Sequence, residues 1–160
     1  MTERIFVVLV LAAFAAGCGS DEKAPHASQP TTSAPSLAGA YERRLTHADI
    51  ERTDHLRDES LPGQEKPQPG PLKLALEHGT LTMIDVGAGV TIRQDYSATS
   101  DGAFRIGAYQ APDQGAFCGP DVSQTASYTW KQLGDVLTLK AEQDECADRD
   151  SSLSGQWQRR

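Results

Sequence analysis

The chain lacks most of the features that identify an enzyme or a nucleic-acid binder. Its 160 residues include 15 Lys and Arg against 22 Asp and Glu, giving a formal net charge of −7, and no basic run exceeds two residues. An acidic chain without a basic patch is poorly suited to bind nucleic acid. The sequence contains no HExxH, no GxSxG and no glycine-rich phosphate loop. We therefore expect no nucleic-acid partner, no metal, no cofactor and no enzymatic activity.

The histidines and the acidic residues do not change this expectation. His47, His55 and His78 have no metal-ligand spacing, and we interpret all three as surface residues. An acidic run near the C-terminus does not have the spacing of a calcium-binding loop, and we interpret it as a solvated acidic loop. Its members are Glu142, Asp144, Glu145, Asp148 and Asp150.

Long apolar runs are also absent, except close to the N-terminus. The run from Ile5 to Phe14 follows a short polar head and precedes small residues, an order typical of a secretory signal peptide. It is far shorter than the roughly 20 residues that a membrane-spanning helix needs. The sequence therefore predicts an exported protein.

The residues Ala15-Ala16-Gly17-Cys18 resemble the lipobox of bacterial lipoproteins. The resemblance implies cleavage before Cys18 and attachment of a diacylglyceryl group, with acyl chains such as palmitate, to its thiol. The protein would then be anchored by lipid to a membrane of the bacterial cell envelope, facing the extracytoplasmic side. A plain secretory signal with an unmodified Cys18 is the alternative.

Cysteines are few, which makes the two that remain informative. Cys118 and Cys146 would meet an oxidising compartment, where such a pair is usually bonded. Their bond would close a loop worth about 3.5 kcal/mol in the chain-entropy treatment. A metal site and two free thiols are the alternatives, and we favour an intramolecular disulfide.

The chain divides into three parts. Residues 1–17 form the expected signal peptide. Residues 18–37, hereafter the tether, are rich in Ser, Ala, Pro and Thr and include His26. Such a segment buries too little apolar surface to offset its ordering entropy, so we expect it to be flexible. Residues 38–160 are expected to form one domain.

Apolar and polar residues alternate with a period of two through most of this domain. Thr46 and Asp49 predict a short capped helical turn, and a second short helix is expected between Cys146 and Ser154. No helical pattern is long enough for crossover units, which favours an antiparallel up-and-down sheet. We expect a small eight-stranded antiparallel β-barrel, with a β-sandwich as the alternative. The expected strands are 40–46, 72–77, 80–85, 90–96, 104–109, 126–131, 136–139 and 155–159.

The C-terminal third resembles the lipocalin-like domains of secreted bacterial proteins. The residues that carry this are Tyr128-Thr129-Trp130, the run 134–139, Cys146-Ala147-Asp148-Arg149 and Gly155-Gln156-Trp157. Tyr41 stands where lipocalins carry the tryptophan of Gly-x-Trp in the first strand. In that family a basic residue near the final strand covers this aromatic ring, and Arg159 is the nearest candidate. The resemblance implies a barrel with a ligand-binding cup.

Two functions follow from a barrel of this kind. The first is non-enzymatic binding of a small apolar or amphipathic ligand. The alternative is a structural or protein-interaction module of the cell envelope whose barrel is filled by its own side chains. A cavity of some 300 Å3 or more favours the first. The residues expected either to line a pocket or to form the core are Tyr41, Phe104, Tyr128, Trp130 and Trp157.

Overall fold

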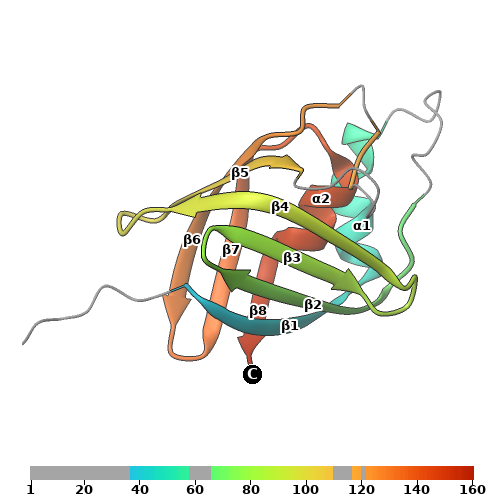
Figure 1. Ribbon diagram of the computed structural model, residues 1–160. Coiled ribbons are helices and arrows are strands. Elements are labelled where there is room, and N and C mark those ends of the chain that lie inside the picture. Colours follow the sequence, from blue (N-terminus) through green and yellow to red (C-terminus); the bar gives the residue numbers. More distant parts are fainter. Residues whose placement is uncertain (1–36, 58–65, 110–116, 120–121) are drawn as a thin grey trace, which may run out of the picture. The chain divides into compact units, whose positions relative to one another are not determined.

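A computed structural model describes residues 37–57, 66–109, 117–119 and 122–160 (Figure 1). The predictions for Cys18, the signal peptide and His26 fall outside these ranges. No helix in the described part of the chain is long and apolar enough to cross a membrane. The elements are β1 Gly39–Leu45, α1 His47–Thr53, a 3-10 helix η1 Asp54–Leu56, β2 Gly70–Glu77, β3 Thr80–Asp85, β4 Val90–Ala98, β5 Ala103–Tyr109, β6 Ala126–Leu133, β7 Val136–Gln143, α2 Ala147–Leu153 and β8 Gly155–Arg159.

The eight strands form a closed antiparallel barrel in chain order. Each strand pairs with the next, and β1 pairs with β8 where Tyr41 lies opposite Arg159. Closure removes the exposed strand edges that an open sheet would leave. The predicted all-β barrel is therefore confirmed, and the alternative of a two-sheet sandwich is excluded.

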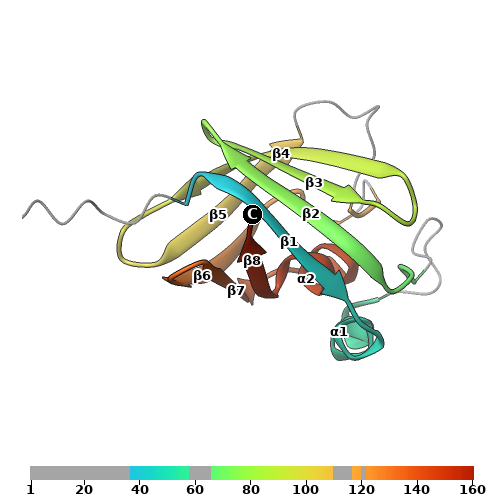
Figure 2. The ribbon, with the colours of Figure 1, turned by 90° about the horizontal axis from the view of Figure 1, so that it is seen from below.

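The barrel has two different ends, which Figures 1 and 2 show in two views. At one end lie the start of β1 and the turns between β2 and β3, β4 and β5, and β6 and β7. We call this the turn end, and Leu37 and Ala38 lie there. At the other end α1 packs against α2. We call this the helix end.

Local sequence determines where α1 begins. The Thr46 side chain accepts a hydrogen bond from the Asp49 backbone N–H, and the Asp49 carboxylate accepts one from the Thr46 backbone N–H in return. This capping box satisfies two backbone donors that the first turn of a helix leaves free. The predicted cap is confirmed, and the second short helix is confirmed as α2.

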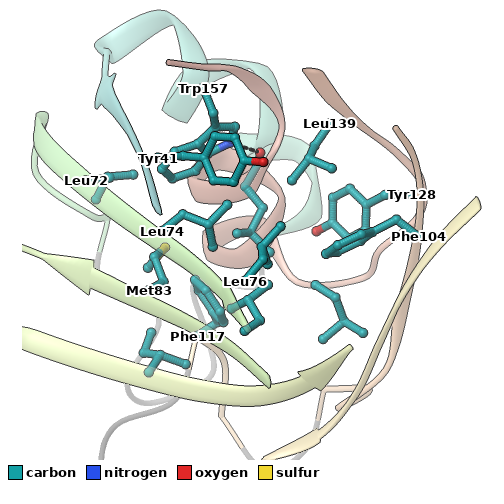
Figure 3. Close-up of a cluster of buried hydrophobic side chains, with 14 of the residues drawn as sticks. Tyr41, Leu72, Leu74, Leu76, Met83, Phe104, Phe117, Tyr128, Leu139 and Trp157 are labelled. Carbon is teal, nitrogen blue, oxygen red and sulfur yellow. Dashed lines mark hydrogen bonds between the residues drawn. The ribbon is translucent and has the colours of Figure 1, made fainter. Parts of the chain in front are cut away.

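Inward-facing side chains fill the barrel lumen (Figure 3). Alternate residues of every strand point inside because successive side chains of a strand project to opposite faces. Trp157 and Phe104 are fully buried, and Tyr41 and Tyr128 are 1% and 2% exposed, so these four predicted aromatics form the core. Around them pack Leu45, Leu72, Leu74, Leu76, Leu81, Met83, Ile92, Ile106, Phe117, Leu137, Leu139 and Leu153.

Two arginine–aromatic contacts flank the seam between β1 and β8. The Arg159 guanidinium lies 5.7 Å from the centre of the Tyr41 ring, which is the cover that the lipocalin resemblance implies. The Arg43 guanidinium lies 5.6 Å from the Trp157 ring. A Cβ atom at Gly155 would stand only 2.6 Å from Arg43 Nη1, so a larger residue there would force the Arg43 side chain to shift, and the φ of 128° at this position also favours glycine.

Candidate functional site

Buried side chains pack the lumen of the barrel. Its aromatic residues pack against leucines and against each other, and Phe104 meets Tyr128 edge to face at 6.2 Å between ring centres. Trp130 is the exception among the five predicted aromatics. It lies on the same face of β6 as Tyr128 but near the turn end, where it is only partly buried.

Trp130 lines an open depression at the turn end, which we call the turn-end depression. Its volume is about 480 Å3. Its walls come from the residues before β1, the β2–β3 turn, the end of β4 with the connection to β5, and β6. The lining residues are Leu37, Ala38, His78, Gly79, Tyr96, Ser97, Ala98, Thr99, Ser100 and Trp130.

The two aromatic side chains of this depression, Tyr96 and Trp130, are fixed by contacts with the rest of the barrel. The Tyr96 ring stacks on Phe104 with 5.3 Å between ring centres and an interplanar angle of 21°, so the lumen core supports it. The indole Nε1–H of Trp130 donates to the Thr99 carbonyl at 3.0 Å. The Trp130 backbone N–H donates to the Gly102 carbonyl at 2.7 Å. Both rings are therefore positioned before any ligand arrives.

The β2–β3 turn forms the facing rim. His78 and Gly79 both have positive φ, 49° and 82°, as a two-residue type I′ hairpin requires. The Gly79 carbonyl accepts a hydrogen bond of 2.7 Å from the Tyr96 backbone N–H, which ties the turn to the aromatic wall. His78 is exposed, as predicted.

The depression carries no strong charge. Asp, Glu, Lys and Arg are all absent from its lining. Burial raises the pKa of the Tyr96 phenol, and the nearby Tyr41 phenol adds to this, so Tyr96 stays neutral at physiological pH. Its hydroxyl has no hydrogen-bond partner among the described residues. An uncharged polar group is thus free to bind a ligand.

A second depression, of about 740 Å3, lies beside β5, β6 and the end of β7. Its lining is mainly polar and includes Arg105, Glu142, Asp144 and Glu145. The most buried of these, Asp144, already binds internal partners. This depression is larger, but it lacks aromatic walls, and we do not assign a ligand to it.

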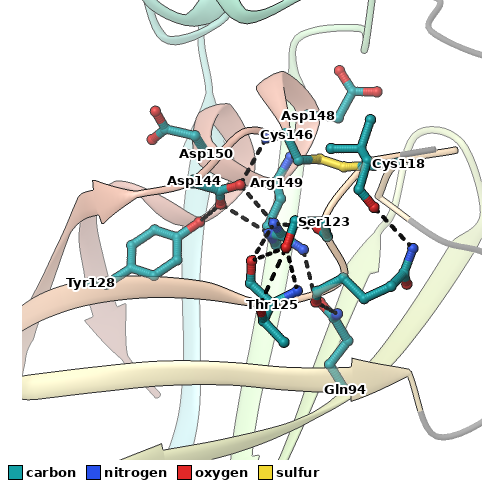
Figure 4. Close-up of polar contacts among 12 residues, drawn as sticks. Gln94, Cys118, Ser123, Thr125, Tyr128, Asp144, Cys146, Asp148, Arg149 and Asp150 are labelled. Atoms are coloured by element: carbon teal, nitrogen blue, oxygen red, sulfur yellow. Dashed lines mark hydrogen bonds and ion pairs between the residues drawn. A yellow bond between two sulfur atoms is a disulfide. The ribbon is translucent and has the colours of Figure 1, made fainter. Parts of the chain in front are cut away.

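The partners of Asp144 form a buried polar cluster at the helix end (Figure 4). The Arg149 and Asp144 side chains are both fully buried, and two Arg149 nitrogens donate to the two carboxylate oxygens at 2.7 and 2.9 Å. Arg149 also donates to the carbonyls of Gln124, Ser123 and Thr125 at 3.0–3.2 Å. The Tyr128 hydroxyl donates to the same carboxylate.

The prediction of a solvated acidic loop is therefore wrong for part of the run. Asp144 is enclosed, and Asp150, at 7% exposure, accepts from Arg52 at 3.2 Å. Asp148 pairs with the nearly buried Arg57 at 2.7 Å. Burial raises the pKa of Asp148, and Arg57 opposes this shift. The alternation of apolar and polar residues in the sequence does not predict these ion pairs. Each pair joins residues from different parts of the fold or from opposite sides of Cys146 in the sequence.

The structure joins Cys118 to Cys146 by a disulfide, as predicted. The bond ties residue 118 to the start of α2. The Cys146 sulfur also accepts a hydrogen bond of 3.3 Å from the Arg149 backbone N–H, so it serves as the N-cap of that helix. The disulfide thus fixes the same end of the barrel as the Arg149 cluster.

Replacing Cys118 and Cys146 together by serine should lower the free energy of unfolding by about 2–5 kcal/mol. The unfolded chain regains the freedom of a loop spanning 28 residues. Urea denaturation of the variant and of the parent measures the loss, and reduced parent protein is the matched control. Equal stability of the variant and the oxidised parent would contradict the structural role of the bond.

The remaining histidines lie on the surface. His47 and His55 are exposed, as expected for surface residues. The described part of the chain contains no group of three or more His, Cys, Asp or Glu that could hold a metal ion.

Comparison of the chain with protein-family models, with curated proteins and with solved structures finds no match. A functional proposal therefore depends on the sequence patterns, the barrel and its depressions.

Proposed function

We propose that this protein is a lipid-anchored lipoprotein of the bacterial cell envelope. In this proposal its lipocalin-like barrel binds a small apolar or amphipathic molecule without catalysis. The ligand lies in the turn-end depression, and the filled lumen serves as the rigid support of that site.

One observation carries the location of the ligand. The turn-end depression exceeds the roughly 300 Å3 that small-molecule sites need, and Tyr96 and Trp130 give it fixed aromatic walls. The lumen, by contrast, is occupied by side chains that are almost fully buried. Ligand binding at the end of the barrel therefore fits the geometry better than binding inside it.

Replacing Trp130 by alanine should weaken binding of the neutral apolar dye Nile red about tenfold or more. The change removes a large aromatic wall, and burial of one such side chain against a ligand is worth at least about 1.5 kcal/mol. Dye fluorescence titrated with the folded variant measures the loss. Leu133→Ser is the control, because Leu133 is 77% exposed and does not line the depression. Parent-like dye binding by Trp130→Ala would remove the depression as the site.

Replacing Cys18 by alanine should release the protein from the membrane fraction and abolish metabolic labelling with a fatty acid. The expectation rests on the Ala15-Ala16-Gly17-Cys18 pattern. Ser20→Ala changes a neighbouring residue without removing the thiol, and it should behave like the parent. Labelling that persists in Cys18→Ala would end the assignment of the lipid to this residue.

The filled lumen favours a second candidate function, a structural or protein-interaction module of the envelope. The two candidates differ in what co-purifies with the protein. Mass spectrometry of small molecules extracted from natively purified protein should find a bound amphiphile if the first holds. Extracts without any bound molecule, together with no Nile red binding, would support the module instead.

A further inference from the structure

We infer that the turn-end depression selects uncharged amphiphiles that carry hydroxyl groups, and that it discriminates against anionic ones of the same chain length. The inference rests on the proposed function and names the ligand class of that same site. It follows from the absence of charge in the lining, from the polar groups that remain free there and from the apolar walls.

The first step concerns charge. A carboxylate that packs against the aromatic walls loses part of its water contacts, and no Lys or Arg in the lining replaces them. The Arg159 guanidinium beside Ala38 is already engaged by the Ala38 carbonyl and the Tyr41 ring. An ionised group that is desolvated without a partner is strongly disfavoured. The net charge of −7 adds long-range repulsion of anions. An uncharged head group avoids both penalties.

The second step concerns hydrogen bonding. Tyr96 belongs to the lining, and its hydroxyl has no partner among the described residues. The hydroxyl of Thr99 and the indole N–H of Trp130 are already engaged within the β4–β5 connection. Tyr96 is therefore the side chain best placed to exchange a hydrogen bond with a ligand hydroxyl, because a phenol both donates and accepts.

The third step concerns the apolar part of the ligand. Leu37, Ala98 and the two aromatic rings provide a surface for a hydrocarbon chain or a ring. The Tyr96 ring stacks on Phe104, which is part of the lumen core. This packing keeps the Tyr96 ring in position when a ligand binds. An amphiphile satisfies both halves of the site, whereas a fully polar molecule leaves the aromatic walls in contact with water.

The test compares 1-lauroylglycerol with laurate, which share one acyl chain and differ in head-group charge at about pH 8. Tryptophan fluorescence reports binding, and below the micelle concentration of each probe the parent should bind the glyceride at least about tenfold more tightly. The signal should come from Trp130, since Trp157 is fully buried. Trp130→Phe should therefore abolish the fluorescence change.

Two variants sharpen the comparison. Tyr96→Phe keeps the ring on Phe104 but removes the hydroxyl, and it should weaken glyceride binding about two- to tenfold by calorimetry. Leu133→Ser lies outside the lining and should bind like the parent. Laurate binding as tight as that of the glyceride would overturn the inference and leave the proposed function standing. Binding of neither probe would overturn the proposed function, and the inference with it.

Discussion

Arg149→Ala is expected to destabilise the fold by about 3–5 kcal/mol, because it leaves a buried carboxylate without its counter-ion. The Asp144 side chain is fully buried, and among the described residues its charge is balanced by Arg149. The same substitution removes one donor from each of the backbone carbonyls of Ser123, Gln124 and Thr125, although Gln124 and Thr125 keep a second donor. Urea denaturation monitored by circular dichroism measures the change in the free energy of unfolding.

The matched control for this prediction is Arg52→Ala. Arg52 also pairs with an aspartate of the helix end, Asp150, but its side chain is 46% exposed. Water reaches this pair from the Arg52 side, and Asp150 keeps the hydrogen bond that the Ser154 hydroxyl donates, so this variant should lose less than Arg149→Ala. Equal losses in the two variants would show that Arg149 does not hold the helix end together as described.

Trp157→Ala is expected to cost about 3–5 kcal/mol and to lower the melting temperature sharply. Trp157 is fully buried, and its indole N–H donates to the Leu153 carbonyl at 2.8 Å. It lies on β8 beside the seam with β1, where Arg43 covers its ring. The truncation opens a cavity and leaves both partners without their contact.

Trp130→Ala provides the comparison, since the chain has only these two tryptophans. Trp130 is partly buried and lines a depression that is open to water, so its loss should lower the melting temperature less. If Trp157→Ala melted like the parent and also bound Nile red like the parent, the residue would be exposed and the register of β8 wrong. If it kept its melting temperature but lost Nile red binding, Trp157 would contact the ligand and the lumen would not be filled.

The arrangement of the strands was predictable because it depends on local signals. Side chains alternate along each strand, and Gly79 and Gly134 have the positive φ that their turns require. Thr46 and Asp49 mark the start of α1 through contacts three residues apart. Such signals lie within a few residues of one another, so a reading of the sequence can detect them.

The Arg149 cluster was not predictable in the same way. Its carbonyl partners lie 24–26 residues earlier in the chain. The acidic run around it has the composition of a solvated loop, and only the packing of α2 at the helix end encloses Asp144. The short sequence Asp144-x-Cys146-x-x-Arg149 was the one local signal of this cluster. It contains both residues of the ion pair and the cysteine that caps α2.

The turn-end depression shows the same limit for function. The alternation of side chains along β6 correctly predicted that Trp130 faces the same side of the strand as Tyr128. The alternation of inward and outward side chains along a strand does not show how far a residue lies from the end of the barrel. That distance decides whether an aromatic ring is buried in the lumen or lines an open depression. Tyr96, which was not among the predicted site residues, lines the depression with Trp130 although 34 positions separate them in the sequence.

The sequence by itself determined the antiparallel barrel, the capped α1 and the pairing of Cys118 with Cys146, because alternation, turn chemistry and cysteine count are properties of short segments or of the whole composition. Tertiary structure alone decided that the lumen is filled, that Arg149 neutralises Asp144 and that a neutral aromatic depression forms at the turn end. These features depend on barrel closure, which brings side chains from distant strands to fixed positions along one axis.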